Sequence, residues 1–404
     1  MAIPLSYNIR NVIQRPLTTL ATGSGIAMVV MILIGAFALA SGFQAALVET
    51  GSPDNAFIRR TGADSEISSG VGRDAAAIIG SLPDVATGPD GRPLISKDLV
   101  VLTNLERVGQ TGSSNVTIRG IDPSSLTLRP QMKVTAGRMF APGTDEVIVG
   151  ERTARRFQGL GINGKVMLGQ QSFTVVGHFT AGGSAFESEI WGDNAVLMPA
   201  LDRNDAFQSI TFRMRPAGPG DQYVDDKGHR RSRRFDALKN QLENDRRLGV
   251  QVQTEREFYA SQSALLAGVI RGAGVFITLI MAIGAIFGAM NTMYAAVGQR
   301  TREIAVLQTL GFTPGSIMMS FLFESVFLAL IGGVLGCILA LPINGITTST
   351  TNWASFSEVA FAFRVTPIGM AIGLAFAAIM GVVGGFLPAR QAARQSLAAT
   401  LRAA

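Results

Sequence analysis

Residues 272–299 read GAGVFITLIMAIGAIFGAMNTMYAAVGQ and contain no charged side chain. An α-helix rises about 1.5 Å per residue, so roughly 20 apolar residues cross the hydrocarbon core of a bilayer. Helices in the cores of soluble proteins rarely remain uncharged over such a length. This stretch therefore predicts a membrane-spanning helix, and it places the chain in the membrane-protein class.

Three other stretches have the same character. Residues 16–48 and 365–389 carry no charge, and residues 316–343 contain only Glu324. The first stretch could also be a signal peptide, because Ala38-Leu39-Ala40 resembles a cleavage site. Its apolar run is longer than the apolar region of a signal peptide, which favours an uncleaved anchor.

The composition fits this class, because only 16% of the residues are charged against about 25% in soluble domains. Nine of the 35 basic and three of the 29 acidic residues lie outside residues 44–260, so the net charge of +6 comes from the flanks of the apolar stretches. This distribution indicates membrane orientation and not nucleic-acid binding. A single cysteine, Cys337, and two histidines, His178 and His229, argue against a disulfide framework or a metal centre.

The short flanks also predict the orientation. Arg10 and Arg15 precede the first stretch, and Arg300 and Arg302 lie between the second and third. By the positive-inside rule, both termini and the Arg300 segment are cytoplasmic, and residues 44–260 are extracytoplasmic.

The expected fold is an α-helical membrane protein with four transmembrane helices and a large mixed α/β extracytoplasmic domain between helices 1 and 2. Its parts are a cytoplasmic amphipathic elbow helix (1–17), a first transmembrane helix (18–43), the α/β domain (44–260), a stalk helix that continues as the second transmembrane helix (255–299, membrane part 272–296), a cytoplasmic coupling segment (298–315), a third transmembrane helix (316–343), a short extracytoplasmic loop (344–365), a fourth transmembrane helix (366–388) and a cytoplasmic tail (389–404). Small residues four apart predict close helix contacts: Gly268/Gly272, Gly284/Gly288, Gly332/Gly336, Gly369/Gly373 and Gly381/Gly385.

Alternation of apolar and polar residues predicts several strands in the central domain. Proline, glycine and charge predict an exposed loop over residues 216–234, before an amphipathic helix that Gly249 would end. The predicted elements are strands at Asn115–Ile121, Glu146–Val149 and Ser209–Arg215, a hairpin of Val166–Leu168 with Phe173–Val176, a helix over Arg152–Phe157 and a second helix that buries Phe235, Leu238 and Leu242.

Thr254 and Glu257 have the spacing of a capping box, and no helix breaker follows before residue 299. One helix over residues 255–299 would be about 65 Å long and would form a stalk above the membrane. A kink near residues 268–274 is the alternative.

Residues 300–315 predict a short helix over Arg302–Leu310, with Ile304, Leu307 and Leu310 at helical spacing and Gly311 as its end. A helix this short cannot bury its apolar face alone, so it either lies on lipid or docks into a cytoplasmic partner.

Other motifs favour structural roles. Residues 159–165 (GLGINGK) match most of a phosphate-binding loop, but Val166 replaces the hydroxyl that would hold Mg²⁺, which favours a helix-to-strand turn. Glu324 is an intramembrane carboxylate, either part of a proton relay or, as we expect, an acceptor for a neighbouring Arg or Asn. No arrangement of catalytic side chains is visible, so we expect a non-catalytic membrane subunit.

Several segments together resemble the MacB/FtsX-type permeases of ATP-binding-cassette (ABC) transporters. They are QRTREIAVLQTLGF (299–312), FE (323–324), GGVLG (332–336) and FLPARQAA (386–393), with GRMF (137–140), DEVIVG (145–150) and FTVVG (173–177) in the outer domain.

The resemblance implies a permease in a bacterial inner membrane that couples ATP hydrolysis in a separate ABC ATPase subunit to movements of the outer domain, for export or extraction of a substrate. It assigns the ATPase contact to Arg300, Arg302, Glu303, Ile304, Leu307, Leu310 and Gly311. ATP and Mg²⁺ would bind to the partner and no cofactor to this chain. A second permease, identical or homologous, and a periplasmic adaptor or membrane fusion protein are the further expected partners.

Two alternatives remain at this point. An FtsX-like protein would instead regulate a cell-envelope hydrolase or another envelope partner through the same machinery. An ion-driven carrier would need intramembrane charges that this sequence lacks.

Overall fold

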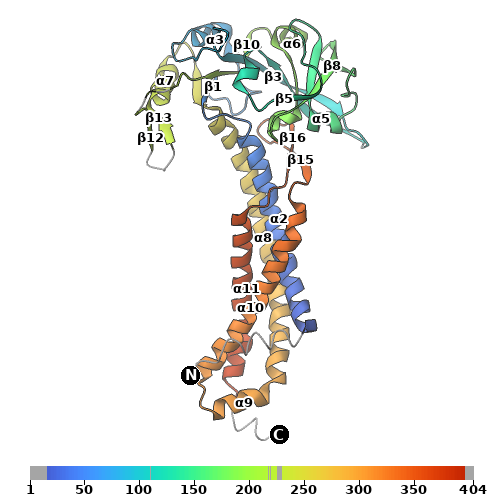
Figure 1. The fold of residues 1–404 in the computed structure, drawn as a ribbon, viewed down its shortest axis with the longest axis vertical. Helices are drawn as coiled ribbons and strands as arrows, with labels where there is room; N and C mark the ends of the chain where they lie inside the picture. The colour runs from blue at the N-terminus through green and yellow to red at the C-terminus, as the bar shows by residue number, and fades with distance from the viewer. Residues whose placement is uncertain (1–15, 110, 217, 219, 225–229, 396–404) are drawn as a thin grey trace. The chain divides into compact units, whose positions relative to one another are not determined.

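A computed structural model describes residues 16–109, 111–216, 218, 220–224 and 230–395, so the elbow helix expected at 1–17 lies almost wholly outside the described residues. The chain divides into two compact units (Figure 1). The helical unit comprises Met1–Gly42, Ala267–Ile346 and Phe363–Ala404, and the α/β unit comprises Phe43–Leu266 and Thr347–Ala362.

Four long helices confirm the predicted fold class. They are α2 (Pro16–Val48), α8 (Glu255–Gln299), α10 (Pro314–Ala340) and α11 (Pro367–Ala393). A 3₁₀ turn, η2 (Leu341–Ile343), follows α10. Each of the four helices is long and apolar enough to span a membrane. Thr313 and Thr366 cap α10 and α11, and a proline is the first residue of each helix. Buried residues of all four helices form one apolar core in the helical unit.

Glycines bring α10 into backbone contact with its neighbours in the helical unit. A Cβ on Gly336 would lie 2.6 Å from the Ala27 carbonyl oxygen of α2, and one on Gly385 would lie 2.4 Å from the Ser325 Cβ of α10. The glycine pairs on α10 and α11 therefore pack as predicted. The pairs on α8 do not, because a Cβ on Gly268, Gly272, Gly284 or Gly288 would meet no atom within 4 Å.

A ten-stranded sheet forms the centre of the α/β unit, in the order β14-β1-β11-β3-β4-β9-β6-β8-β5 with β7 paired to β8. The pairs β4–β9 and β6–β8 are parallel and the other pairs are antiparallel. The strands are β1 (Asn55–Arg60), β3 (Ile95–Glu106), β4 (Ser113–Ile121), β5 (Lys133–Gly137), β6 (Glu146–Gly150), β7 (Lys165–Leu168), β8 (Gln171–Thr180), β9 (Glu189–Asp193), β11 (Ser209–Arg213) and β14 (Val250–Thr254).

Short helices cover the sheet over two separate apolar cores. One core joins helices α3 (Arg73–Gly80) and α7 (Arg233–Asn244) to β1, β11 and β14, and the other joins α6 (Asn194–Ala200) to β4, β6, β8 and β9. The remaining short elements are β2 (Val71–Gly72), which pairs with β10 (Ala206–Phe207), and α4 (Ser125–Leu128), α5 (Glu151–Arg156) and η1 (Ala185–Ser188).

The structure confirms the predicted strands and the hairpin of β7 with β8, because alternation of buried and exposed residues is a local signal. The glycine-rich residues 159–164 form the turn between α5 and β7, as expected.

Two local predictions were wrong. The expected loop 216–234 contains a hairpin of β12 (Gln222–Val224) with β13 (Arg230–Ser232) and the start of α7. Gly249 does not end α7, because that helix stops at Asn244 and Gly249, with a φ of 56°, precedes β14.

A second hairpin, β15 (Thr347–Thr351) with β16 (Glu358–Ala362), lies in the expected loop between α10 and α11 and belongs to the α/β unit. Glu358 forms ion pairs with Arg107 and Arg156. The backbone N–H of Ala360 donates to the Ser188 hydroxyl at 2.9 Å, and its carbonyl accepts from Arg152 at 2.7 Å. The α10–α11 connection is thus fastened to the sheet.

Candidate functional site

Helix α9 (Thr301–Thr309) is the short helix between α8 and α10, and its ends are defined by local geometry. After α9, Gly311 adopts a φ of 87°, its N–H donates to the Gln308 carbonyl, and the Phe312 N–H donates to the Leu307 carbonyl. These two bonds make a Schellman end, which requires the left-handed conformation that glycine adopts readily. The next residues, Thr313 and Pro314, begin α10 at once, so the turn between the two helices is tightly defined.

The two sides of α9 differ. Ile304 is 1% exposed and packs with Ile317 and Phe321 of α10, whereas Val306 and Leu310 are 56% and 65% exposed. Arg302 and Glu303 are also exposed, and Leu307 is half-buried. The exposed side, which we call the α9 face, consists of Arg302, Glu303, Val306 and Leu310.

The expectation that Ile304, Leu307 and Leu310 share one apolar face was wrong. Residues three apart are 300° apart around a helix of 3.6 residues per turn, so a spacing of three gradually leaves the starting face. Ile304 therefore points into the helical unit, while Leu310, about 120° further around by the same geometry, is 65% exposed.

Arg300, which the resemblance assigns to the ATPase contact, lies at the junction of α8 and α9 and is only 4% exposed. Its Nη1 atom is 2.8 Å from Oε2 of Glu324 on α10, and Glu324 is 5% exposed. Glu324 thus has an arginine partner, the structural arrangement we expected. The pair ties the start of α9 to α10, because a buried charge without a partner is very unfavourable.

The other end of α8 begins in the α/β unit. Thr254 and Glu257 exchange the two hydrogen bonds of a capping box, from the Glu257 N–H to the Thr254 hydroxyl at 3.1 Å and from the Thr254 N–H to the Glu257 carboxylate at 3.2 Å. Both bonds are exposed to solvent. They fix where the helix starts, directly after β14, whose last residue is Thr254.

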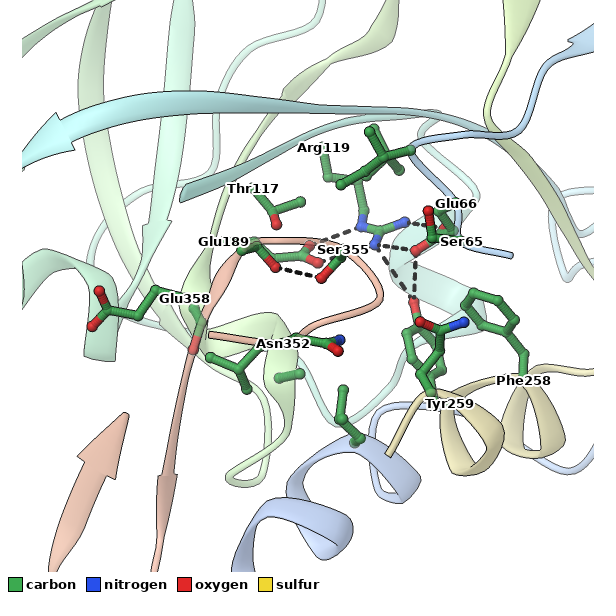
Figure 2. A pocket seen from close by; sticks show the side chains of 18 residues that line it. Ser65, Glu66, Thr117, Arg119, Glu189, Phe258, Tyr259, Asn352, Ser355 and Glu358 are labelled. Atoms are coloured by element: carbon green, nitrogen blue, oxygen red, sulfur yellow. Dashed lines mark hydrogen bonds and ion pairs between the residues drawn. The ribbon is translucent and has the colours of Figure 1, made fainter. Parts of the chain in front are cut away.

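Beside this helix start, the α/β unit has a small open hollow with Arg119 in its wall (Figure 2). Arg119 is 1% exposed and forms ion pairs with Glu66, Asp98 and Glu189 at 2.9, 3.2 and 2.8 Å. Burial lowers the pKa of Arg119, but Glu189 and Glu66 outweigh it and raise this pKa well above its ordinary value. Burial likewise raises the pKa of Asp98, but Arg129 and Arg119 outweigh it and hold that pKa below its usual range.

The charged side chains around Arg119 are therefore paired with one another. Such pairing fixes the positions of the side chains and does not activate a nucleophile. In the described part of the chain, no group of three or more His, Cys, Asp or Glu side chains is placed to hold a metal ion. His178 bonds to the Leu160 carbonyl, and Cys337 is buried in α10.

Comparison with known proteins identifies both units. Residues 19–225 match the model of the MacB-like periplasmic core domain, and residues 275–397 match that of the FtsX-like permease C-terminal domain. The chain belongs to the MacB/FtsX-type permeases of ABC transporters.

Relatives of this permease include a Pyoverdine export ATP-binding/permease protein PvdT from Pseudomonas entomophila (strain L48), with 29% identity over 80% of this chain and 47% of the relative. A Macrolide export ATP-binding/permease protein MacB from Bordetella avium (strain 197N) is 32% identical over 37% of this chain and 23% of that protein. The chain thus spans less than half the length of these relatives. Among solved structures, the periplasmic region of MacB from Actinobacillus actinomycetemcomitans aligns with 52% of this chain and 92% of its own at 11% identity, with a TM-score of 0.36.

Sequence reasoning missed three features of this MacB/FtsX-type permease. Val306 lies within the quoted motif, and its position on a helical wheel opposite Ile304 could have revealed it. Glu255 lies inside the capping box but is buried, and nothing in the neighbouring sequence predicts that burial. Arg119 is a core arginine whose partners come from three distant segments, which only the tertiary structure brings together.

Proposed function

We propose that this permease couples ATP hydrolysis by an ABC-type ATPase to movements of its α/β unit, which we place on the extracytoplasmic side of a bacterial inner membrane. The observation that supports this most is the two-sided helix α9. One side packs into the helical unit and is tied there by the Arg300–Glu324 pair, while the α9 face remains exposed. Such a helix can receive a push from a docked protein and pass it to α8 and α10. We assign ATP and Mg²⁺ to that ATPase.

Helix α8 is the proposed route of the movement. It is one uninterrupted helix of 45 residues that begins in the α/β unit and ends beside Arg300. A continuous helix transmits displacement along its axis because every backbone hydrogen bond resists extension. In this proposal the substrate is handled by the α/β unit, outside the bilayer, for export or extraction.

We propose that the working complex contains a second permease, identical or homologous. In support, a Cβ added to Gly272, Gly284 or Gly288 of α8 would meet no atom within 4 Å, and Phe276 and Phe287 near them are 65% and 63% exposed. Small residues on a lipid-facing helix allow close approach of another helix. A periplasmic adaptor is a further proposed partner of the α/β unit.

Docking on the α9 face can be tested by replacing Val306 and Leu310 with aspartate. Neither side chain is buried, so V306D/L310D should leave the helical unit folded while co-purification of the ATPase falls about tenfold or more. Leu310→Met is the matched control, because it keeps an apolar side chain at the same position. Normal ATPase recovery and normal hydrolysis with V306D/L310D would refute the assignment.

Regulation of an envelope hydrolase is the alternative function, and it would use the same coupling helix. Crosslinking of the complete chain in cells, followed by identification of proteins joined to the α/β unit, separates the two. Recovery of an adaptor or membrane fusion protein supports export, and recovery of a cell-wall hydrolase supports signalling.

A further inference from the structure

The first turn of α8 is bound to the α/β unit by a buried carboxylate. Glu255 is 1% exposed, and its Oε2 atom accepts hydrogen bonds from the Ser52 N–H at 3.0 Å and the Asn55 amide at 2.8 Å. Its Oε1 atom lies 3.6 Å from Nε of Arg129. A Cβ on Gly51 would lie 2.5 Å from the Glu255 carbonyl, so the backbones are in direct contact. Glu255 thus joins the start of α8 to the segment between α2 and β1.

Tyr259 lies one turn further along α8, on the same side as Glu255, and is 6% exposed. Its hydroxyl donates to the Glu66 carboxylate at 3.3 Å and accepts from Nη2 of Arg119 at 3.5 Å (Figure 2). The ring of Phe258, between these two turns, stacks on Phe57 of β1 at 4.2 Å. This end of the helix therefore has polar contacts as well as aromatic packing.

From these contacts, ion pairs continue into the middle of the sheet. Arg129 reaches Asp98 of β3 at 2.7 Å, and Asp98 in turn contacts Arg119 of β4. Arg119 makes two bonds to Glu189 of β9, at 2.8 and 3.0 Å. Both guanidinium groups also lie over the ring of Phe186, at 5.2 and 4.9 Å. Residues from α8, β3, β4 and β9 thus share one buried network.

We propose that Glu255 and Tyr259 are positioning residues that transmit a displacement of α8 to strands β3, β4 and β9 through this network. The inference rests on the proposed function, because it says where the movement of α8 is delivered. Buried ion pairs are poor sources of stability compared with apolar packing, but buried hydrogen-bonded networks fix geometry. The directional links from α8 are the two hydrogen bonds that Glu255 Oε2 accepts and the two bonds of the Tyr259 hydroxyl, whereas Glu255 Oε1 and Nε of Arg129 form an ion pair at 3.6 Å without a hydrogen bond. Apolar contacts tolerate sliding, whereas hydrogen bonds weaken steeply once their angle or distance changes. Strands that are held to α8 by the directional bonds of Glu255 and Tyr259 therefore move with the helix.

The test compares three variants of the complete permease, purified with its ATPase and placed in lipid nanodiscs. Tyr259→Phe removes only the hydroxyl, and Glu255→Gln keeps the side-chain shape and removes the charge. Glu257→Gln is the matched control, because it changes a glutamate of the same helix turn that faces solvent. Hydrogen exchange is measured without nucleotide and with ATP plus vanadate. Fluorescence of buried Trp191 checks that each α/β unit is folded.

In the wild type we expect nucleotide to change the exchange rates in α9 and in β3, β4 and β9. In Y259F and E255Q the change in α9 and the ATPase rate should remain within about twofold of wild type, while the change in the strands falls about fivefold or more. Glu257→Gln should behave as wild type. If folded Y259F keeps the full nucleotide-dependent change in the exchange of the strands, transmission through Glu255 and Tyr259 is refuted and the proposed function is not. If the wild type shows no nucleotide-dependent change in α9 or in the strands, the proposed function is refuted. If E255Q fails to fold, the exchange of the strands in Y259F tests the proposal by itself.

Discussion

Single residues at the junction of α8 and α9 determine how α9 is held. Replacing Glu324 with leucine leaves Arg300 buried without its partner, which should destabilise the helical unit by about 3–5 kcal/mol. Adding Arg300→Met removes the second charge and should restore most of the loss, since a buried pair replaced by apolar side chains is often tolerated. The single cysteine, Cys337, is buried in this unit, so its labelling by a thiol-reactive dye on heating reports the unfolding. Equal stability of the single and double variants would contradict a stabilising pair.

The buried Asp98 predicts a pH dependence for the α/β unit. Its folded-state pKa lies below the ordinary value of 3.8, because Arg129 and Arg119 outweigh the effect of burial. The charged form therefore stabilises the fold above about pH 4, and this contribution is lost as the pH falls through the folded-state pKa. Unfolding followed by Trp191 fluorescence should occur at lower temperature below pH 4, and Asp98→Asn should be less stable at neutral pH but less sensitive to acid. Asp90→Asn, at a side chain that is 63% exposed, should keep the wild-type profile.

Among the elements, α10 depends on close packing against α2. Gly336→Ala places a Cβ 2.6 Å from the Ala27 carbonyl oxygen, so one helix must move. We expect a loss of about 1–3 kcal/mol in the helical unit, the usual cost of overpacking. Gly25→Ala on α2 is the control, because its Cβ meets no atom within 4 Å and alanine favours the helix by roughly 0.5–1 kcal/mol. Labelling of Cys337 measures both, and a loss with Gly25→Ala as large as with Gly336→Ala would argue against the contact.

The β15–β16 hairpin should loosen when its ion pairs are removed. Glu358→Gln replaces a carboxylate that is 4% exposed and faces Arg107 and Arg156, and hydrogen bonds to charged groups contribute about 1.5–3 kcal/mol. We expect amide exchange over residues 347–362 to speed up about tenfold or more, with β4 unchanged. Trp353→Phe, a half-exposed site on the same hairpin, should leave the exchange rates as they are. Unchanged rates in Glu358→Gln would show that other contacts fasten the hairpin.

For the whole molecule, the predictable features were those with a local signal. An apolar run of about 20 residues is sufficient evidence for a spanning helix, and alternation along β4 or β11 is sufficient for a strand. The β15–β16 hairpin was not predicted, because Thr347–Thr351 contains no apolar residue. Its attachment to the sheet depends on Arg107 and Arg156, which are far away in the sequence. The network around Arg119 was not predicted either, because its partners are also far away in the sequence. An arginine in a strand ordinarily indicates a solvent-facing position.

In the proposed function, movement at α9 reaches the α/β unit through a continuous α8. Changing Val269→Pro and Ile270→Gly together creates Gly-Pro-Gly at residues 268–270 and interrupts the helix, because proline removes a backbone hydrogen bond at a cost of about 3 kcal/mol or more. The matched control, V269A/I270A, changes the same two positions and keeps the helix.

The most direct measurement is the nucleotide-dependent change in hydrogen exchange of β3, β4 and β9 in these two variants, purified with the ATPase. We predict that V269P/I270G retains ATPase binding and hydrolysis but loses the response of the strands, whereas V269A/I270A retains all three. A full strand response in V269P/I270G would contradict transmission through α8.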